Sequence, residues 1–463
     1  TYEWNDSGYL DKIHRPTGGD LTLMQNDRGE LTRVSDGSGD LRITRDVADR
    51  IERIDYPNGR WIAYGIGPGG RRTSMSTSDG HIVRYEYDTY GRLVALRDGS
   101  DALIESCSFD SAGRVVERRY GNGTRSEIRY RAEGYVDEIV LRDASDQVMD
   151  RIGYQHDRAG RVRAIESSDG TWTYSYDAAG QLIGSTHSDG SVLEYAYDAA
   201  GNRTSVSGSE GSTAYQVNSL NQYTRAGGDR LDYDMNGNLT RIDGMDGTRI
   251  FEYDDEDRLT HASGPDGTWD FEYDGLGSLV AVVENGSRTE FLVDPAGDSS
   301  IVAEYGEGGD LRYFYAGGMG PSMREDAGGN RDFFWYDGLG HTNALVDAGG
   351  DLIEQYGYAP FGEDDPGSGA ANRFRYGGRH GLMSFGDDLI YVRRRFYCPS
   401  LGRFLSEDRV YPDGRNLYAY VQNDPVNRYD SSGEQDIPWV YKQIQYLVGT
   451  HKSHQDGTVN WAE

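Results

Sequence analysis

Residues 85–96 read YEYDTYGRLVAL, and this stretch decides the fold because it specifies a β-hairpin by itself. Its aromatic–polar–aromatic start predicts a strand with one buried and one solvated face. Asp88 and Gly91 then predict a tight turn, since an Asp at the first position accepts hydrogen bonds from nearby N–H groups and a Gly at the last position tolerates positive φ. The run 92–96 supplies the second strand.

The same pattern returns along most of the chain. The aromatic residue before the turn recurs at intervals of mostly 20 to 22 residues, and fainter copies reach the N-terminus. Asp-Gly turns such as 189–190 close each unit. We therefore expect one hairpin array over residues 1–355, laid side by side into a continuous antiparallel ribbon. Clear copies lie at 174–185, 195–206, 231–242, 251–262 and 271–282.

A ribbon of this length cannot stay flat, because strand twist accumulates and an open edge invites aggregation. We therefore predict an all-β fold in which the ribbon coils on itself, with its tyrosine-rich face inward, to form a hollow shell. A β-propeller is the alternative, although a four-stranded blade needs about twice this period, so that units would have to pair.

Composition excludes several classes of partner. The formal net charge is −30, from 77 acidic and 47 basic side chains, so nucleic acid and anionic lipid are repelled over most of the surface. No apolar run approaches the ~20 residues of a membrane span. The two cysteines, Cys107 and Cys398, imply no disulfide framework. An acidic, lysine-poor surface fits a salty or extracellular setting, and a GC-rich genome gives the same arginine bias.

Three downstream segments add a more specific signal: YGYAPFGE at 356–363, YVRRRFYCPSLGRFLSED at 391–408 and NLYAYVQNDPVNRYDSSGE at 416–434. Together with the repeats, they resemble the RHS/YD-repeat family, which includes bacterial RHS polymorphic toxins, toxin-complex C components and the YD shells of teneurins. The resemblance implies a hollow β-cocoon plugged by an RHS-associated core. It implies that the array (1–355) is followed by the core (356–434) and by the start or stub of an effector region (435–463).

The family core is described as an aspartyl protease that cuts the chain just after itself. By position, the resemblance implies a catalytic pair of Asp408 and Asp430, with Arg403 as the electrostatic helper. The implied cleavage site consists of Gly433 and Glu434, and the cut falls directly after Glu434. Such chemistry needs two carboxylates close enough that one keeps a proton while the other activates water. NLYAYV is expected to form a strand between the two acids.

The sequence departs from the family pattern at four positions. Cys398 stands where the family has Asp, and Arg409 and Ser431 replace prolines. Glu434 replaces Leu, which places an acid beside a carboxylate pair and indicates slow or lost cleavage, so an enzyme activity is left open.

Each candidate residue also has a structural interpretation. Asp430 lies in a Tyr-Asp-x-x-Gly turn like those of the repeats, and Asp408 fits a solvated loop. The arginines at 393–395 crowd one strand and compete with Arg403 for the local acids. Cys398 is expected to be a buried thiol, because no histidine is placed to activate it.

The C-terminal tail carries two further patterns. IPWVYKQIQYLV at 437–448 predicts a short amphipathic helix. His451, His454 and Asp456 have metal-like spacing, but their position in a tail favours no metal site. We expect no metal and no cofactor in this chain.

The sequence therefore favours a shell that encapsulates and delivers a C-terminal effector polypeptide, with self-cleavage after the core. The expected partners are that effector and a second shell or delivery protein, and the expected location is secreted or at the bacterial cell surface. A non-enzymatic surface protein that uses the array for adhesion or carbohydrate contact is the alternative.

Overall fold

The computed structural model describes residues 1–16, 19–209, 211–296, 300–318, 320–363, 372–386, 388–409, 416–434 and 437–438. Within these ranges the first 35 strands form one antiparallel sheet, in which each strand pairs with its neighbours in sequence. The sheet is not divided into blades, so the ribbon is confirmed and the propeller is excluded. Helical structure in the described part is limited to 3₁₀ turns, η1 (Pro68–Gly70), η2 (Glu307–Gly309), η3 (Gly378–His380) and η4 (Val421–Asn423).

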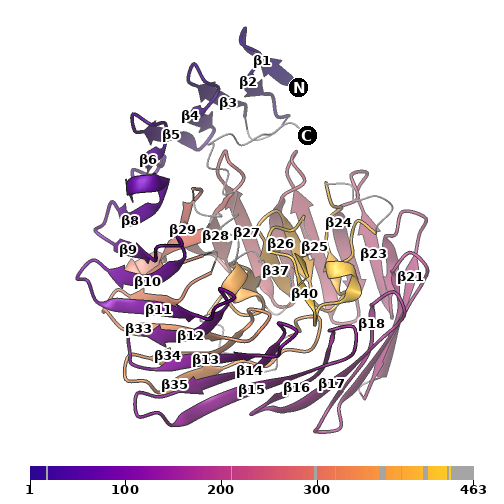
Figure 1. Cartoon of the computed structure of the whole chain (residues 1–463). Helices are drawn as coiled ribbons and strands as arrows, with labels where there is room; N and C mark the ends of the chain where they lie inside the picture. Colours follow the sequence, from indigo (N-terminus) through magenta and orange to yellow (C-terminus); the bar gives the residue numbers. More distant parts are fainter. Residues whose placement is uncertain are drawn as a thin grey trace.

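The ribbon begins as a narrow arm at the top of Figure 1 and descends into a broad front wall. The arm consists of β1 (Tyr2–Trp4), β2 (Leu10–Ile13), β3 (Leu21–Gln25), β4 (Leu31–Asp36), β5 (Gly39–Arg45), β6 (Ile51–Asp55), β7 (Trp61–Ile66), β8 (Arg72–Thr77) and β9 (Ile82–Tyr87). The front wall consists of β10 (Leu93–Asp98), β11 (Leu103–Phe109), β12 (Val115–Tyr120), β13 (Arg125–Tyr130), β14 (Val136–Arg142), β15 (Val148–His156), β16 (Val162–Ser167), β17 (Gly170–Tyr176), β18 (Leu182–His187), β19 (Val192–Tyr197) and β20 (Arg203–Gly208).

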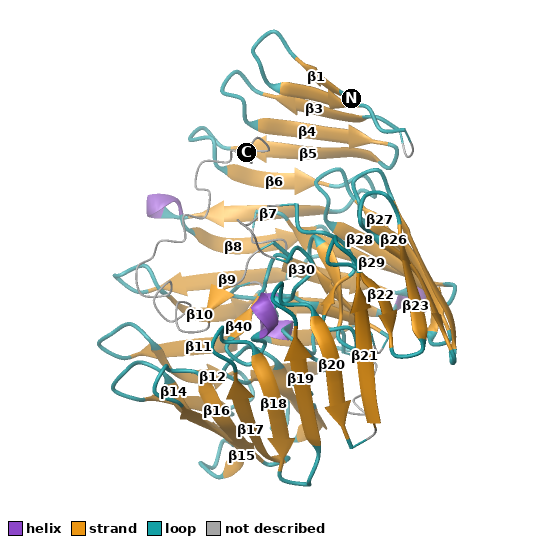
Figure 2. Ribbon diagram, turned by 90° about the vertical axis from the view of Figure 1, so that its right-hand side faces the viewer, coloured by secondary structure: helices purple, strands orange, loops and turns teal. Residues whose placement is uncertain are grey.

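The ribbon then turns through a rear wall and returns behind the front wall, which makes a coil that is not closed (Figures 1 and 2). The rear wall consists of β21 (Gly211–Val217), β22 (Tyr223–Ala226), β23 (Asp229–Tyr233), β24 (Leu239–Gly244), β25 (Gly247–Tyr253), β26 (Leu259–Gly264), β27 (Gly267–Tyr273), β28 (Leu279–Glu284) and β29 (Ser287–Asp294). The returning strands are β30 (Ser300–Tyr305), β31 (Leu311–Tyr315), β32 (Met323–Asp326), β33 (Arg331–Tyr336), β34 (Thr342–Asp347) and β35 (Leu352–Gln355).

The turn of each hairpin explains the repeated Asp-x-x-Gly-Arg/Asn pattern. Asp88 Oδ1 accepts hydrogen bonds from the backbone N–H groups of Tyr90 and Arg92, both at 2.9 Å, and Gly91 has φ of 85°. Arg92 Nε donates to Asp88 Oδ2 at 2.6 Å. One carboxylate thus fixes both the turn and the residue after it. The same side-chain bond joins Asp110 to Arg114, Asp157 to Arg161, Asp177 to Gln181, Asp198 to Asn202, Asp234 to Asn238 and Asp254 to Arg258.

The tyrosine before each Asp links one repeat to the previous one. Tyr253 Oη donates to the Leu239 carbonyl oxygen at 2.9 Å, so the ring lies inward and its hydroxyl satisfies a backbone acceptor. This bond explains why tyrosine, rather than phenylalanine, dominates the position. It recurs from Tyr130 to Val115, Tyr176 to Val162, Tyr197 to Leu182 and Tyr273 to Leu259.

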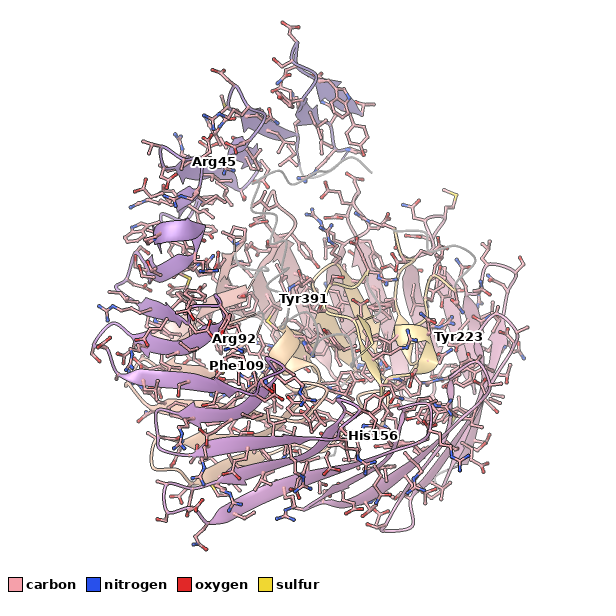
Figure 3. The ribbon with its side chains drawn as sticks, in the orientation of Figure 1. Arg45, Arg92, Phe109, His156, Tyr223 and Tyr391 are labelled. Atoms are coloured by element: carbon pink, nitrogen blue, oxygen red, sulfur yellow. The ribbon has the colours of Figure 1, made fainter. Side chains whose placement is uncertain are left out.

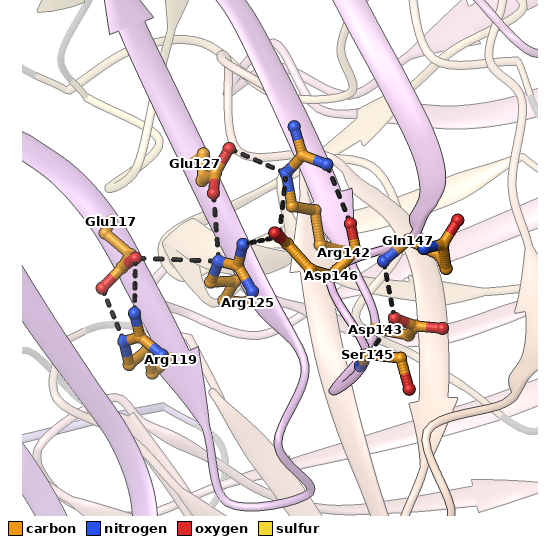
Figure 4. A network of polar contacts seen from close by, with 9 residues as sticks. All are labelled: Glu117, Arg119, Arg125, Glu127, Arg142, Asp143, Ser145, Asp146 and Gln147. Atoms are coloured by element: carbon orange, nitrogen blue, oxygen red, sulfur yellow. Dashed lines mark hydrogen bonds and ion pairs between the residues drawn. The ribbon is translucent and has the colours of Figure 1, made fainter.

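Ion pairs connect neighbouring strands on the partly exposed side of the front wall (Figure 4). Arg125 on β13 bonds Glu127 at 3.0 Å and also pairs with Asp146 in the β14–β15 turn. Arg142 on β14 bonds Glu127 at 2.9 Å. Pairs of this kind are worth little singly, but a network limits strand slippage by placing opposite charges across the register.

Although the coil is not closed, its arm contacts the rear wall along a seam between residues more than 200 positions apart. Tyr56 Oη donates to the Val293 carbonyl at 2.5 Å, and Arg15 Nη2 lies 2.9 Å from Glu256 Oε1. Apolar side chains of the arm and of the returning strands share one hydrophobic cluster, which includes Ile54, Ile62, Val83, Val302, Met323 and Phe333. Burial of apolar area along this seam holds the arm against the rear wall.

Asp274 is a turn aspartate that the seam has buried. Ser278 occupies the position where other repeats carry Arg or Asn, and arm residues Val34 and Leu21 approach the turn at Gly275. Among the described residues, the carboxylate accepts hydrogen bonds only from the backbone N–H groups of Leu276 and Ser278, both at 2.9 Å. Burial raises the pKa of Asp274 to about 6.

We expect Asp274→Asn to stabilise the protein at about pH 7.5 by roughly 1–3 kcal/mol. The folded-state pKa lies above the unfolded value, so the protonated carboxyl stabilises the fold fully below about pH 4, and this contribution is lost as the pH rises through about 6. Asn keeps the acceptor oxygen and lacks the charge. Unfolding midpoints of both proteins at pH 5 and pH 8 measure the effect, and Asp234→Asn is the control turn. A gain as large at the lower pH would contradict the assignment.

The C-terminal core lies inside the curve of the ribbon, behind the front wall in Figure 1. Its aromatic side chains pack directly on the rear wall, since the ring of Phe271 lies 5.2 Å from Phe385 and 4.6 Å from Phe396. The core is thereby part of the same hydrophobic interior as the repeats. Its strands are β36 (Met383–Phe385), β37 (Leu389–Val392), β38 (Arg395–Cys398), β39 (Arg403–Phe404) and β40 (Arg428–Tyr429), and β40 pairs with β41 (Ile437–Pro438), which follows the core.

Candidate functional site

A buried arginine joins the candidate acids to the candidate cleavage segment. Arg395, at the start of β38, is 6% exposed, and its Nη2 lies 3.0 Å from Asp408 Oδ2. Its Nε donates to the Gly433 carbonyl oxygen, and its Nη1 donates to the Leu417 carbonyl at 2.9 Å. One guanidinium therefore holds a carboxylate and two carbonyls in fixed directions.

The electrostatics of Arg395 show which acids surround it. Burial lowers the pKa of the guanidinium, and the carboxylates of Asp408, Asp430 and Glu434 oppose that shift. Its plane also lies 3.6 Å from the ring of Phe404. The structure thus brings Asp408, Asp430 and the segment around Gly433 to one dry site, where charge interactions are stronger than in water.

The three consecutive arginines of the β37–β38 turn all contact residues 431–434. Arg393 has φ of 55° and donates to the Ser431 carbonyl and, at 2.7 Å, to the His380 carbonyl. Arg394 Nε lies 3.4 Å from Glu434 Oε2. Together with the bond from Arg395 to Gly433, these arginines contact the segment at residues 431, 433 and 434. Arg394 is the cationic neighbour of the Glu434 side chain.

Asp430 has the turn role expected of it, in a modified form. Its Oδ1 accepts the backbone N–H groups of Ser432 at 3.0 Å and Gly433 at 2.8 Å, whereas Asp88 bonds residues two and four positions ahead. Gly433 has φ of 80°, and a Cβ there would lie 2.5 Å from the Val392 carbonyl oxygen, so only glycine fits. Asp430 itself is 3% exposed.

Arg403 lies elsewhere. Its Nη1 donates to the Asn221 carbonyl at 2.8 Å, its Nη2 donates to Asn202 Oδ1 at 3.0 Å, and its guanidinium lies 3.4 Å from the Tyr223 ring. These contacts anchor the core to the turns of the repeat array. The arginine in contact with Asp408 is instead Arg395, one of the three arginines that the sequence crowds onto one strand. The run of three arginines at 393–395 was the available signal.

The remaining sequence expectations have mixed outcomes. Cys398 is buried, and burial raises the pKa of its thiol well above the usual range, as expected for a structural cysteine. The expected strand NLYAYV is wrong: residues 416–421 form turns with a single bridge between Ala419 and Arg403. Residues 437 and 438, the first two of the predicted helix at 437–448, form the short strand β41. The rest of that segment lies outside the described residues, as do His451 and His454.

Metal sites and membrane-spanning helices are two other features to consider in the described ranges. Among these residues, no group of three or more His, Cys, Asp or Glu side chains is placed to hold a metal ion. No helix in the same part of the chain has the length and apolar character needed to cross a bilayer.

Comparison with known proteins identifies the repeat array. The sequence profile of the teneurin YD-shell matches residues 147–426, more than half of the chain. The chain is 27% identical over 180 residues to the toxin protein Tse5 of Pseudomonas aeruginosa, which covers 38% of this chain and 12% of the relative. It is 28% identical over 200 residues to the probable deoxyribonuclease RhsA of Dickeya dadantii, which covers 39% and 13%.

Solved structures show the same fold. The complex of TcdB2 and TccC3 without its hypervariable C-terminal region has a TM-score of 0.70 at 18% identity and covers 94% of this chain and 26% of that one. The Tc holotoxin pore of Photorhabdus luminescens has a TM-score of 0.62 at 15% identity, with 93% and 28% covered. The chain thus spans about a quarter of these structures and about an eighth of the curated relatives above. On the profile match and the shared coil of hairpins, the chain belongs to the teneurin YD-shell family of RHS/YD-repeat proteins.

Proposed function

We propose that this chain forms part of a toxin-delivery shell whose core, residues 356–434, cuts the polypeptide at its own C-terminal edge and leaves the downstream effector inside. The array 1–355 is the wall, and residues from 435 onward begin the effector region. The observation that carries the proposal is the buried Arg395, which bonds both Asp408 and the Gly433 carbonyl, while Asp430 accepts the Gly433 N–H and acts on the charge of Arg395. Similarity to proteins named as toxins supports the delivery role. We further propose a secreted or cell-surface location.

The contacts favour hydrolysis of the Gly433–Glu434 peptide bond. A water molecule attacks the Gly433 carbonyl carbon, and one of the two carboxylates, Asp408 or Asp430, takes its proton. Arg395 stabilises the negative charge that develops on the carbonyl oxygen. The C–N bond breaks as the other carboxyl group gives a proton to the Glu434 nitrogen, so water is the only co-reactant. Cleavage after Glu434, which the family resemblance implies, is the neighbouring alternative.

The intact mass of the purified chain tests this proposal. Wild type carrying a compact reporter domain after Glu463 is expected to give two fragments, whereas Asp408→Asn and Asp430→Asn stay whole. Asn keeps the shape of the side chain and cannot act as the base. The mass of the N-terminal fragment separates cleavage after Gly433 from cleavage after Glu434, because the two differ by one glutamate residue.

Two controls complete the experiment. Asp232→Asn removes an exposed carboxylate from the array and is expected to leave cleavage unchanged. Brief protease treatment of the intact particle is expected to spare the downstream segment while digesting the same segment in isolation. Uncut wild type together with an unprotected downstream segment would contradict the proposal and favour the surface-adhesion alternative.

A further inference from the structure

A cavity of about 1280 Å³ lies between the N-terminal strands and the returning strands. One side is built by the arm and upper front wall, from β5 to β12, and the other by β29 to β33, with Arg379 of η3 reaching it from the core. Its volume exceeds that of pockets for small ligands, which hold roughly 300–1,000 Å³. The cavity therefore has room for a ligand larger than a metabolite.

The charge of this cavity is opposite to that of the chain. Seven arginines and four carboxylates line it, although the formal net charge of the protein is −30. A concave site with low-dielectric walls concentrates the field of its own charges, so its sign determines what enters. Seven of the 47 basic residues of this acidic protein thus line one inner surface, where they attract an anionic ligand most strongly.

One end of the cavity holds two arginines around a single buried carboxylate. Glu105 is 6% exposed and accepts hydrogen bonds from Arg118 and from the Ser322 hydroxyl. Burial by itself raises the pKa of Glu105. The guanidinium groups of Arg118 and Arg379 outweigh this effect and hold the pKa of Glu105 below its usual value. Cys107 Sγ lies 3.5 Å from Glu105 Oε1, and burial raises the pKa of this thiol to about 12, so it stays neutral. The cluster therefore carries an excess positive charge.

Two guanidinium groups of the cavity lining form no direct ion pair among the described residues, although Arg379 lies close enough to Glu105 to lower its pKa. Arg379 lies 5.6 Å from the ring of Tyr336, and Arg71, in the loop before β8, lies 5.9 Å from the ring of Tyr87. Arg72, next to it, is by contrast neutralised by Asp294 at 2.5 Å. Planar guanidinium groups recognise carboxylates through paired hydrogen bonds, so Arg379 and Arg71 are suited to acidic side chains.

The rest of the lining suits an extended polypeptide. Aromatic rings and glycine turns make up much of it, as at Gly91 beside Arg92. Arg92 lies 4.3 Å from the ring of Phe109, and Figure 3 labels both on the front wall. Aromatic faces bind many side-chain sequences without selecting one.

We propose that this cavity holds an acidic segment of the enclosed polypeptide in extended form, with its carboxylates bound by Arg379 and Arg71. This inference rests on the proposed delivery function and adds the chemical class of one segment of the enclosed polypeptide. Binding in extended form keeps that segment from folding, since ordered contacts with the wall replace contacts within the segment.

Peptide titration of the purified chain tests the inference. The probes are an octapeptide that alternates Glu and Gly, and matched peptides with Gln or Lys in place of Glu, followed by isothermal titration calorimetry at low salt. The acidic peptide is expected to bind about tenfold or more tightly than the Gln peptide, with affinity that falls as salt is added. The Lys peptide is expected not to bind.

The variants separate this cavity from general surface charge. Arg379→Gln is expected to weaken the acidic peptide about tenfold, because its side chain has no ion pair to lose within the protein. Glu105→Gln keeps the acceptor for Arg118 and Ser322 and is expected to strengthen binding. Arg119→Gln is the matched control: it follows Arg118 on β12, is 57% exposed, belongs to the network of Figure 4, and is expected to change nothing.

Three results would overturn the inference. The acidic and Gln peptides could bind with equal affinity, the acidic peptide could fail to bind, or Arg379→Gln and Arg119→Gln could lose equal affinity for it. Each of these results is independent of the cleavage and protease-protection experiments. A chain that cleaves and protects its downstream segment while failing the peptide test would retain the delivery function and lose only the acidic-segment assignment.

Discussion

Replacement of Arg395 by Met is expected to destabilise the core by about 3–5 kcal/mol and to abolish self-cleavage. The guanidinium is the group that places a positive charge beside the buried Asp408, whose side chain is 11% exposed, and it also donates to the carbonyls of Gly433 and Leu417. Met keeps an unbranched apolar stem but offers no charge and no donor. The cost therefore combines the loss of this ion pair with the loss of a donor at two backbone carbonyls.

Thermal unfolding and hydrogen exchange measure this effect. Exchange is expected to increase first at 428–434 and at β38, which the guanidinium connects. Arg395→Lys tests geometry separately from charge: an ammonium group retains the attraction to Asp408 but does not span three acceptors, so we expect partial recovery of stability without recovery of cleavage.

Arg403→Met is the informative comparison, because this arginine is also buried and was the helper that the family resemblance implied. Its partners are a carbonyl, an amide and an aromatic ring, so its loss strands no carboxylate, and we expect about 1–3 kcal/mol of destabilisation. Cleavage is expected to continue in the folded fraction. Loss of cleavage in Arg403→Met and its persistence in Arg395→Met would reverse the two assignments.

The second large effect is expected at the seam, where Asp294→Ala should cost about 3–5 kcal/mol and loosen the arm from the rear wall. Asp294 is 2% exposed; its Oδ1 accepts the Tyr64 hydroxyl at 2.5 Å, and its Oδ2 accepts Arg72 Nη1 at 2.5 Å. One side chain of β29 thus binds two strands that lie more than 200 residues earlier. The substitution leaves a guanidinium and a hydroxyl buried without this acceptor.

Hydrogen exchange resolves where the structure opens. Faster exchange is expected in β7 and β8 while β17 to β20 remain protected, because each strand of a ribbon depends mainly on its neighbours. Asp232→Ala removes a carboxylate paired with Arg230 on the exposed side, and a surface pair of this kind is worth below about 1 kcal/mol. Uniform loss of protection along the whole ribbon would show that the seam is not a separate unit of stability.

The candidate site shows how far residue patterns carry a prediction. The Arg395 guanidinium contacts Asp408 and the Gly433 carbonyl, and Asp430 acts on its charge, whereas the roles that the family motif implied for the two aspartates stay a prediction. The choice between Arg403 and Arg395 was not available from spacing, because both lie in short strands of the core. Their partners follow from the β37–β38 turn, which directs three consecutive arginines toward 431–434.

Similarly, the buried charge of Asp274 looks like any other turn aspartate in the sequence. Only the missing cation at Ser278 distinguishes it locally, and the burial that shifts its pKa comes from arm residues about 240 positions earlier. The cavity has the same origin, since Arg71 and Arg379 come from segments about 300 residues apart.

By itself, the sequence determined the hairpin, its period and the all-β ribbon, because a β-turn with its Asp, Gly and flanking aromatic strand is satisfied by contacts within about twenty residues. The tertiary structure alone decided where the ribbon meets itself, which arginine joins the two aspartates, and which charges face the cavity. These outcomes depend on twist summed over many strands, and a small rotation at each strand, invisible in any single repeat, sets the partners of residues two hundred positions apart.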